Sequence, residues 1–294
     1  MTFSEGGSFE GGRVRSHRGA VAGGGIGILG IAAFLIYQFT GVDVGPALEG
    51  LQGAGGAGAS QGQDTTIGEC SAEEANTQRD CRLSATLQSL DAYWAETLAA
   101  EGVELAVPDA TEFTGGVPTG CGQASSSTGP FYCPPDQGIY LDLGFFDLLE
   151  SQFGASGGPL AEMYVIAHEY GHHIQNVTGQ MDGIDREGTG PESDGVRLEL
   201  QADCYAGMWV YDAVTRKDPD TGVTFLQPIT DQQLDDALSA AEAVGDDHIQ
   251  EQSGGGVNPD LWTHGSSEQR RNWFVTGYNE GSLVACDTFS AQSL

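Results

Sequence analysis

The sequence predicts an α+β domain that is mainly helical, contains a small sheet and follows one transmembrane helix. Two long stretches, 159–177 and 196–214, repeat apolar residues at helical spacing. A short run at 138–143 has the length and composition of a β-strand. The stretch 19–40 is apolar and uncharged, and it is long enough to cross a membrane as a helix.

The beginning of the chain predicts its orientation. About 20 apolar residues span a hydrocarbon core of roughly 30 Å, and residues 19–40 meet that length. Arg13, Arg15 and Arg18 precede them, and basic residues stay inside the cell. We therefore expect residues 1–18 to be a cytoplasmic tail and the rest of this single-pass cell-membrane protein to be extracytoplasmic. The alternative is a cleaved signal peptide, which also exports the domain, but the sequence has no clear cleavage site.

The remaining chain divides into a linker and an acidic domain. Residues 41–66 are rich in Gly, Ala, Ser and Gln, which predicts a flexible linker, so the folded domain spans 67–294. Asp and Glu number 42 against 11 Lys and Arg, a net charge of −31. This charge excludes nucleic acid as a partner. The 4 Trp, 9 Tyr and 12 Phe are enough to build a core, which argues against a disordered acidic chain.

The cysteines are consistent with export. Their even number, six, is typical of disulfides in an oxidising compartment, although six cysteines allow 15 pairings. Proximity in the chain favours Cys121–Cys133 and Cys70–Cys81, which leaves Cys204–Cys286.

The motif with the most chemical content is His168-Glu169-Tyr170-Gly171-His172. An H-E-x-x-H pattern places two imidazoles on one face of a helix, where they bind Zn²⁺. Glu169 can then take a proton from the attacking water. The predicted helix 159–177 has proline at its start and Gly179 after its end. The alternative, a buried polar cluster without a metal, would be costly.

The next predicted helix, 196–214, supplies the third zinc ligand. Glu199 and Asp203 are four residues apart on its otherwise apolar surface, where two bare carboxylates would repel each other. We expect Glu199 to bind the zinc ion and Asp203 to accept a hydrogen bond from a ligand histidine. The alternative is an acidic pair that simply faces water.

These residues carry a family resemblance. H-E-x-x-H followed by E-x-x-x-D resembles the glutamate zincins, and residues 114–289 resemble the bacterial neutral zinc metallopeptidase family of single-pass membrane proteins. The resemblance implies a zincin-like domain, one zinc ion and the disulfides Cys121–Cys133 and Cys204–Cys286. The pair Cys70–Cys81 rests on proximity alone. The matching segments are TGCGQASSSTGPFYCPPDQGIYLDLGFF, YVIAHEYGHHIQN, VRLELQADCYAGMWV, VGDDHIQ and THGSSEQRRNWFVTGY.

A second group of polar residues precedes the last predicted helix. Ser266 and Gln269 form a predicted capping box, so His264 lies just before a helix N-terminus. We expect His264 to donate a hydrogen bond to the developing oxyanion, and Arg270 to bind a substrate carbonyl or an acidic group near the metal. The His…Arg spacing is similar to that of membrane-embedded prenyl proteases. The alternative is a local backbone cap and a surface ion pair.

Other elements complete the predicted fold. We expect helices near 85–100, 231–244 and 267–279, with a capping box of Thr230 and Gln233 before the second, and a small sheet within 110–143. The strand at 138–143 is either a sheet edge that pairs with an extended substrate or an ordinary core strand.

Together these features predict a membrane-anchored zinc endopeptidase that hydrolyses proteins or peptides outside the cytoplasm. Its expected partners are the substrate and, through residues 19–40, the membrane. One alternative is a catalytically silent, zinc-stabilised binding module of the cell envelope, for which the base Glu169 would have no use. Another is a zinc scavenger, but the sequence has no long His-rich tract.

Overall fold

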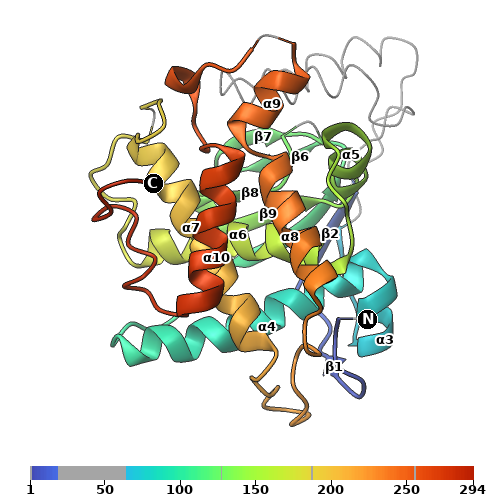
Figure 1. Ribbon diagram of the computed structural model, residues 1–294. Coiled ribbons are helices and arrows are strands. Elements are labelled where there is room, and N and C mark those ends of the chain that lie inside the picture. The colour runs from blue at the N-terminus through green and yellow to red at the C-terminus, as the bar shows by residue number, and fades with distance from the viewer. Residues whose placement is uncertain (1, 19–63, 127, 187, 255) are drawn as a thin grey trace, which may run out of the picture.

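The structure, a computed structural model, describes residues 2–18, 64–126, 128–186, 188–254 and 256–294 and has a mixed α+β architecture with a small sheet (Figure 1). Its helices are α3 (Ala72–Thr77), α4 (Arg79–Ala100), α5 (Phe145–Phe153), α6 (Pro159–Val177), α7 (Asp194–Ala213), α8 (Asp231–Ala243), α9 (Asp246–Gln252) and α10 (Ser267–Glu280). Its strands are β1 (Ser8–Phe9), β2 (Arg15–Arg18), β3 (Asp64–Thr66), β4 (Cys70–Ser71), β5 (Asp109–Thr114), β6 (Val117–Thr119), β7 (Gly122–Ala124), β8 (Phe131–Cys133) and β9 (Gly138–Asp142).

The main sheet joins segments that are distant in the sequence. Its strand order is β3-β2-β5-β9-β8. The three central strands are parallel, whereas β3 and β8 run antiparallel to their neighbours at the two edges. The strand predicted at 138–143 is therefore interior, and the hypothesis that it forms a sheet edge is wrong. The edge strand on that side is β8.

Helix α6 is central to the packing. It contacts α4, α7 and α8, and it reaches the sheet through β8 and β9. Most of its side chains are buried, including Met163, Tyr170 and Ile174. Its bounds confirm the predicted helix, with Pro159 in the first turn, where the missing N–H costs nothing. The capping boxes predicted at Thr230 and Ser266 are also present, at the starts of α8 and α10.

Helices α7 and α10 lie side by side and approach unusually closely (Figure 1). Glycine permits this contact. A Cβ at Gly277 would be 1.8 Å from the carbonyl oxygen of Cys204, and one at Gly207 would be 2.1 Å from that of Phe274. The disulfide Cys204–Cys286 joins the same region to the end of the chain. The close contact fixes α7, which carries Glu199, against α10, which carries Arg270.

All three predicted disulfides are confirmed. Cys70–Cys81, Cys121–Cys133 and Cys204–Cys286 are bonded in the structure.

The N-terminal residues differ from the prediction. Residues 2–18 are not a separate tail, because they supply β1 and β2, and Phe3, Phe9 and Val14 are buried in the core. Likewise, the last residues of the predicted linker form β3. The boundary placed at residue 67 is therefore wrong, since the domain includes residues 2–18 and 64–66.

The predicted membrane helix at 19–40 lies outside the described residues. Among the residues that the structure does describe, none of the helices is both long and apolar enough to cross a membrane.

Candidate metal centre and active site

Two neighbouring helices bring three potential metal ligands together. His168 and His172 are on α6, and Glu199 faces them from α7. The His168 Nε2 atom is 3.1 Å from Glu199 Oε2, and the His172 Nε2 atom is 3.3 Å from Glu199 Oε1. Two ligands at 2.0–2.1 Å from one tetrahedral zinc ion lie about 3.3 Å apart, so this triad has the dimensions of a zinc site.

Hydrogen bonds at the opposite ring nitrogens orient both imidazoles. His168 Nδ1 donates to Asp203 Oδ1 at 2.7 Å, and His172 Nδ1 donates to Gln175 Oε1 at 2.9 Å. The Gln175 amide is itself oriented, because its NH₂ group donates to the carbonyl oxygen of Leu198 at 2.7 Å. Each histidine therefore faces the site with Nε2, the ring nitrogen that would bind a metal ion.

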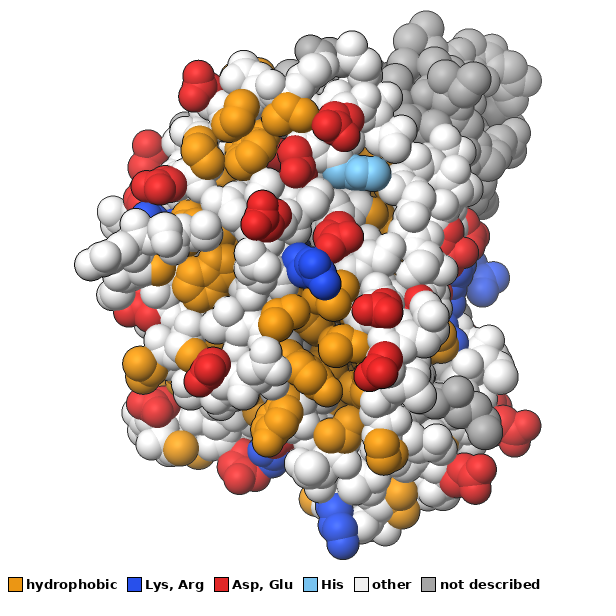
Figure 2. Space-filling view, viewed as in Figure 1, with side chains coloured by type: hydrophobic (Ala, Val, Ile, Leu, Met, Phe, Trp, Pro, Cys, Tyr) orange, Lys and Arg blue, Asp and Glu red, His pale blue; other side chains and the backbone are white. Residues whose placement is uncertain are grey.

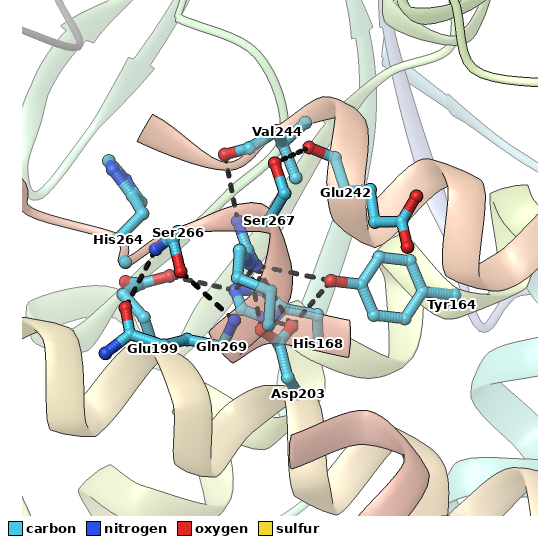
Figure 3. A network of polar contacts seen from close by, with 12 residues as sticks. Tyr164, His168, Glu199, Asp203, Glu242, Val244, His264, Ser266, Ser267 and Gln269 are labelled. Carbon is cyan, nitrogen blue, oxygen red and sulfur yellow. Dashed lines mark hydrogen bonds and ion pairs between the residues drawn. The ribbon is translucent and has the colours of Figure 1, made fainter. Parts of the chain in front are cut away.

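Asp203 is the centre of a buried network (Figure 3). Besides His168, it accepts hydrogen bonds from Tyr164 Oη at 2.5 Å and from Arg270 Nε and Nη2 at 2.8 and 3.0 Å. Its side chain is completely buried, so the alternative of a water-facing acidic pair is wrong for Asp203. Arg270 is buried as well and binds the acidic group rather than facing solvent.

The charges of the site favour a divalent cation. Burial alone would raise the pKa of Asp203, but Arg270 and His168 outweigh it and lower the pKa. Burial would likewise raise the pKa of Glu199, which the facing histidines hold well below its usual value. Burial lowers the pKa of His168, but Asp203 and Glu199 raise it to about 10, so the site attracts positive charge. A metal ion bound by the triad would replace this proton. The ionised carboxylates of Glu169, Glu199 and Asp203 and the guanidinium of Arg270 would then leave two negative charges. Zn²⁺ neutralises them, so both the charge and the donor set fit this ion.

Glu169 is buried beside the triad and lines the same cavity. Burial raises its pKa, while the positive potential at the two histidines acts in the opposite direction. A carboxylate with a raised pKa beside a metal site is suited to accept a proton and pass it on. The cavity has a volume of about 230 Å³, and β8 contributes Phe131 and Tyr132 to its wall.

His264 lines the cavity from the loop before α10, on the side of Glu199 in Figure 3. Its Nδ1 lies 2.8 Å from Thr263 Oγ1 and 3.4 Å from Asp246 Oδ1, so Nε2 is the ring nitrogen available to the cavity. Asp246 Oδ2 also accepts the backbone N–H groups of Thr263, His264 and Gly265 at 2.7, 2.7 and 3.0 Å. Asp246 therefore caps the loop, and the alternative that His264 does so is wrong.

The structure gives His173 a role in packing, away from the triad. The carbonyl oxygen of Ala106 accepts a hydrogen bond from its Nε2, so its Nδ1 accepts one from the Tyr132 hydroxyl at 3.1 Å. That hydroxyl in turn accepts a hydrogen bond from Asn176 Nδ2 at 2.9 Å. Since its only proton is engaged, Tyr132 does not donate to a ligand in the cavity. His264 is therefore the better oxyanion donor of the two.

The sequence comparisons identify the family to which this site belongs. The family described as "Putative neutral zinc metallopeptidase" matches residues 2–289. This chain belongs to that family. The match includes the N-terminal strands as well as the zinc-ligand helices.

Relatives of this member of the neutral zinc metallopeptidase family occur in mycobacteria and in Escherichia coli. An uncharacterized protein of Mycobacterium bovis is 52% identical over 221 residues, which cover 75% of this chain and 74% of the relative. An uncharacterized protein of Mycobacterium tuberculosis gives the same values. The uncharacterized protein YpfJ of Escherichia coli K12 is 39% identical over 211 residues, 70% of each chain. No solved structure matches the chain.

The fold adds residues to the family site that the sequence analysis missed. Tyr164 donates a hydrogen bond to Asp203, which in turn orients His168. Gln175 orients His172, and Asp246 orients His264. One local signal was present for Gln175, which follows His172 by three residues and so lies on the same helix face. Asp246 gave none, because acidic residues are common at helix starts.

Proposed function

We propose that this chain is a zinc-dependent endopeptidase. The observation that carries the proposal is the position of Glu169, buried beside a His–His–Glu triad and facing a cavity with an edge strand in its wall. A purely structural zinc site has four protein ligands and needs no base. Here three ligands leave a fourth position for water or substrate, as in catalytic zinc sites.

The chain's own residues then divide the chemistry of peptide hydrolysis. A zinc ion bound by His168, His172 and Glu199 would polarise the scissile carbonyl and acidify the water. Glu169 removes a proton from the attacking water and transfers it to the leaving amine. His264 Nε2 donates a hydrogen bond to the carbonyl oxygen as negative charge develops, with its ring oriented by Asp246.

The substrate we propose is an extended segment of a protein or peptide. Among the described strands, β8 is the edge of the main sheet beside the cavity, and an extended chain can add to such an edge through backbone hydrogen bonds. The net charge of −31 favours basic substrates over acidic ones. Acidic side chains are spread over the face seen in Figure 2, consistent with this preference.

We propose that the enzyme acts outside the cytoplasm, at the cell membrane. Three disulfides, with no free cysteine in the chain, support an oxidising compartment. The apolar sequence 19–40 supports association with the membrane.

The test is cleavage of an unfolded protein by the purified full chain. We expect about one zinc ion per chain, activity that a chelator abolishes and zinc restores, and no activity in Glu199→Ala, which lacks a ligand. A chain that binds zinc, remains folded and cleaves no unfolded protein would instead support the silent, zinc-stabilised binding module.

A further inference from the structure

The first residues of the chain are bound at several separate places in the domain. The Asn76 side chain accepts hydrogen bonds from the backbone N–H groups of Thr2 and Phe3 at 2.7 and 2.9 Å and donates one to the Phe3 carbonyl at 3.1 Å. On another side, Ser4 N–H donates to the carbonyl oxygen of Phe225 at 3.1 Å. These contacts come from α3 and from the loop after α7, so two parts of the domain that are distant in the sequence bind the N-terminus.

Strand β2 is an interior strand of the main sheet. It pairs with β5 in parallel over Arg15–Arg18 and with β3 on its other edge. In the strand order β3-β2-β5, β3 joins the sheet by pairing with β2. Removal of β2 would therefore expose one edge of β5 and separate β3 from the sheet.

The N-terminal segment also contacts the zinc helix. Arg13 binds Asp91 of α4 with two hydrogen bonds, at 2.7 and 3.1 Å, in a half-buried position. The same carboxylate accepts a hydrogen bond from the hydroxyl of Tyr170 at 2.8 Å. Tyr170 lies on α6 between the two ligand histidines and is fully buried. Residues 2–18 therefore support α6 from the side opposite to the metal triad.

We propose that residues 2–18 are a permanent part of the zinc domain and lie on the same side of the membrane as the zinc site. His17 of β2 pairs with Asp64 of β3, so the chain enters and leaves residues 19–63 at adjacent strands, which are about 4.8 Å apart. A single crossing would place these two points on opposite sides of a hydrocarbon core of roughly 30 Å. Residues 19–40 therefore do not separate a cytoplasmic tail from the domain.

A return crossing by the following residues is disfavoured by their sequence. Residues 41–63 include Asp43 and Glu49 and consist mostly of small or polar residues. An acidic side chain is costly at the centre of a bilayer, and about 20 apolar residues are needed to cross. Residues 19–63 thus contain one apolar stretch that is long enough to cross a membrane. An N-terminus and a zinc domain on the same side of the membrane require either no crossing or two crossings.

Thiol labelling of the full chain in intact cells tests this proposal. All six native cysteines are in disulfides, so one introduced cysteine is the only free thiol. Glu5→Cys reports on the N-terminal segment, and Glu101→Cys, at the exposed end of α4, is the matched reference in the domain. Each variant is treated with a membrane-impermeant maleimide before and after the cell membrane is permeabilised.

We expect the two positions to react alike under both conditions. Labelling of Glu101→Cys in intact cells, with labelling of Glu5→Cys only after permeabilisation, would overturn the proposal and support the single crossing. The reverse pattern would overturn it equally. The result does not depend on peptidase activity, so it stands or fails independently of the proposed function.

Discussion

Replacement of Asp203 by asparagine tests the buried network behind the metal triad. The asparagine side chain would keep the shape of the aspartate and one carbonyl oxygen for His168. It would remove the negative charge that faces the Arg270 guanidinium, whose Nε and Nη2 lie 2.8 and 3.0 Å from the carboxylate. The side chains of Asp203 and Arg270 are almost completely inaccessible to solvent, so water cannot replace the lost charge.

The expected loss of stability is large. Breaking a buried ion pair by removing one partner costs about 3–5 kcal/mol, because the other charge stays buried and unpaired. One kcal/mol shifts the Tm of a domain of this size by roughly 2–4 °C, so the Asp203→Asn variant should unfold roughly 6–20 °C below wild type. Zinc affinity should also fall, by about 10–100-fold, because His168 loses a charged hydrogen-bond partner.

Asp212→Asn is the matched control. Asp212 is on the same helix and also binds an arginine, Arg216, but its side chain is 23% exposed. A pair that solvent reaches contributes about 0–1 kcal/mol, so this variant should lose less than about 4 °C. Thermal unfolding and zinc titration against a competing chelator measure both effects. If Asp203→Asn lost no more stability than Asp212→Asn and bound zinc normally, the reasoning would be refuted.

Three further variants test other parts of the structure. Gly277→Ala places a methyl group 1.8 Å from the carbonyl oxygen of Cys204 and should cost about 1–3 kcal/mol in thermal unfolding, whereas Gly68→Ala, with open space around it, should be neutral. Joint replacement of Cys204 and Cys286 by alanine opens a loop of 82 residues and should lower the free energy of unfolding by about 4–5 kcal/mol in denaturant titrations. His264→Ala should lower kcat and kcat/KM together by about 10²–10³-fold with zinc content unchanged; unchanged kinetics would show that its role is structural.

The sequence predicted those features of the fold that depend on residues close together in the chain. The bounds of α6 and the capping boxes of α8 and α10 follow from residues within a few positions of each other, and the structure confirms them. The ligand triad was predictable for the same reason. Two of its members are one helical turn apart, and the third is on the next long amphipathic helix.

The N-terminal strands were not predictable in this way. Phe3, Phe9 and Val14 are the only large apolar residues of segment 2–18 and are separated by glycines, so neither helix nor strand periodicity appears. This segment pairs with distant parts of the chain. Phe9 pairs with Cys70, Phe3 pairs with Leu226, and β2 pairs with β5, almost a hundred residues away in the sequence. The basic residues resemble an orientation signal in the sequence, although Arg13 in fact binds Asp91 inside the fold.

The role of β8 was missed for a related reason. The sequence indicates that 138–143 is a strand, but its interior position, which leaves β8 at the edge, depends on its pairing with β5 on the side away from β8. Asp246 likewise reaches His264 only because the start of α9 packs against the loop that precedes α10. Such contacts between distant segments require the tertiary structure.

The measurement that tests the central claim most directly compares zinc content and peptidase activity in Glu169→Gln. This residue is next to the triad but is not one of its ligands, and glutamine keeps its size while it cannot accept the proton. The variant should bind zinc with wild-type stoichiometry, unfold near the wild-type Tm and lose nearly all cleavage of an unfolded protein. Full cleavage by zinc-loaded Glu169→Gln would contradict the account.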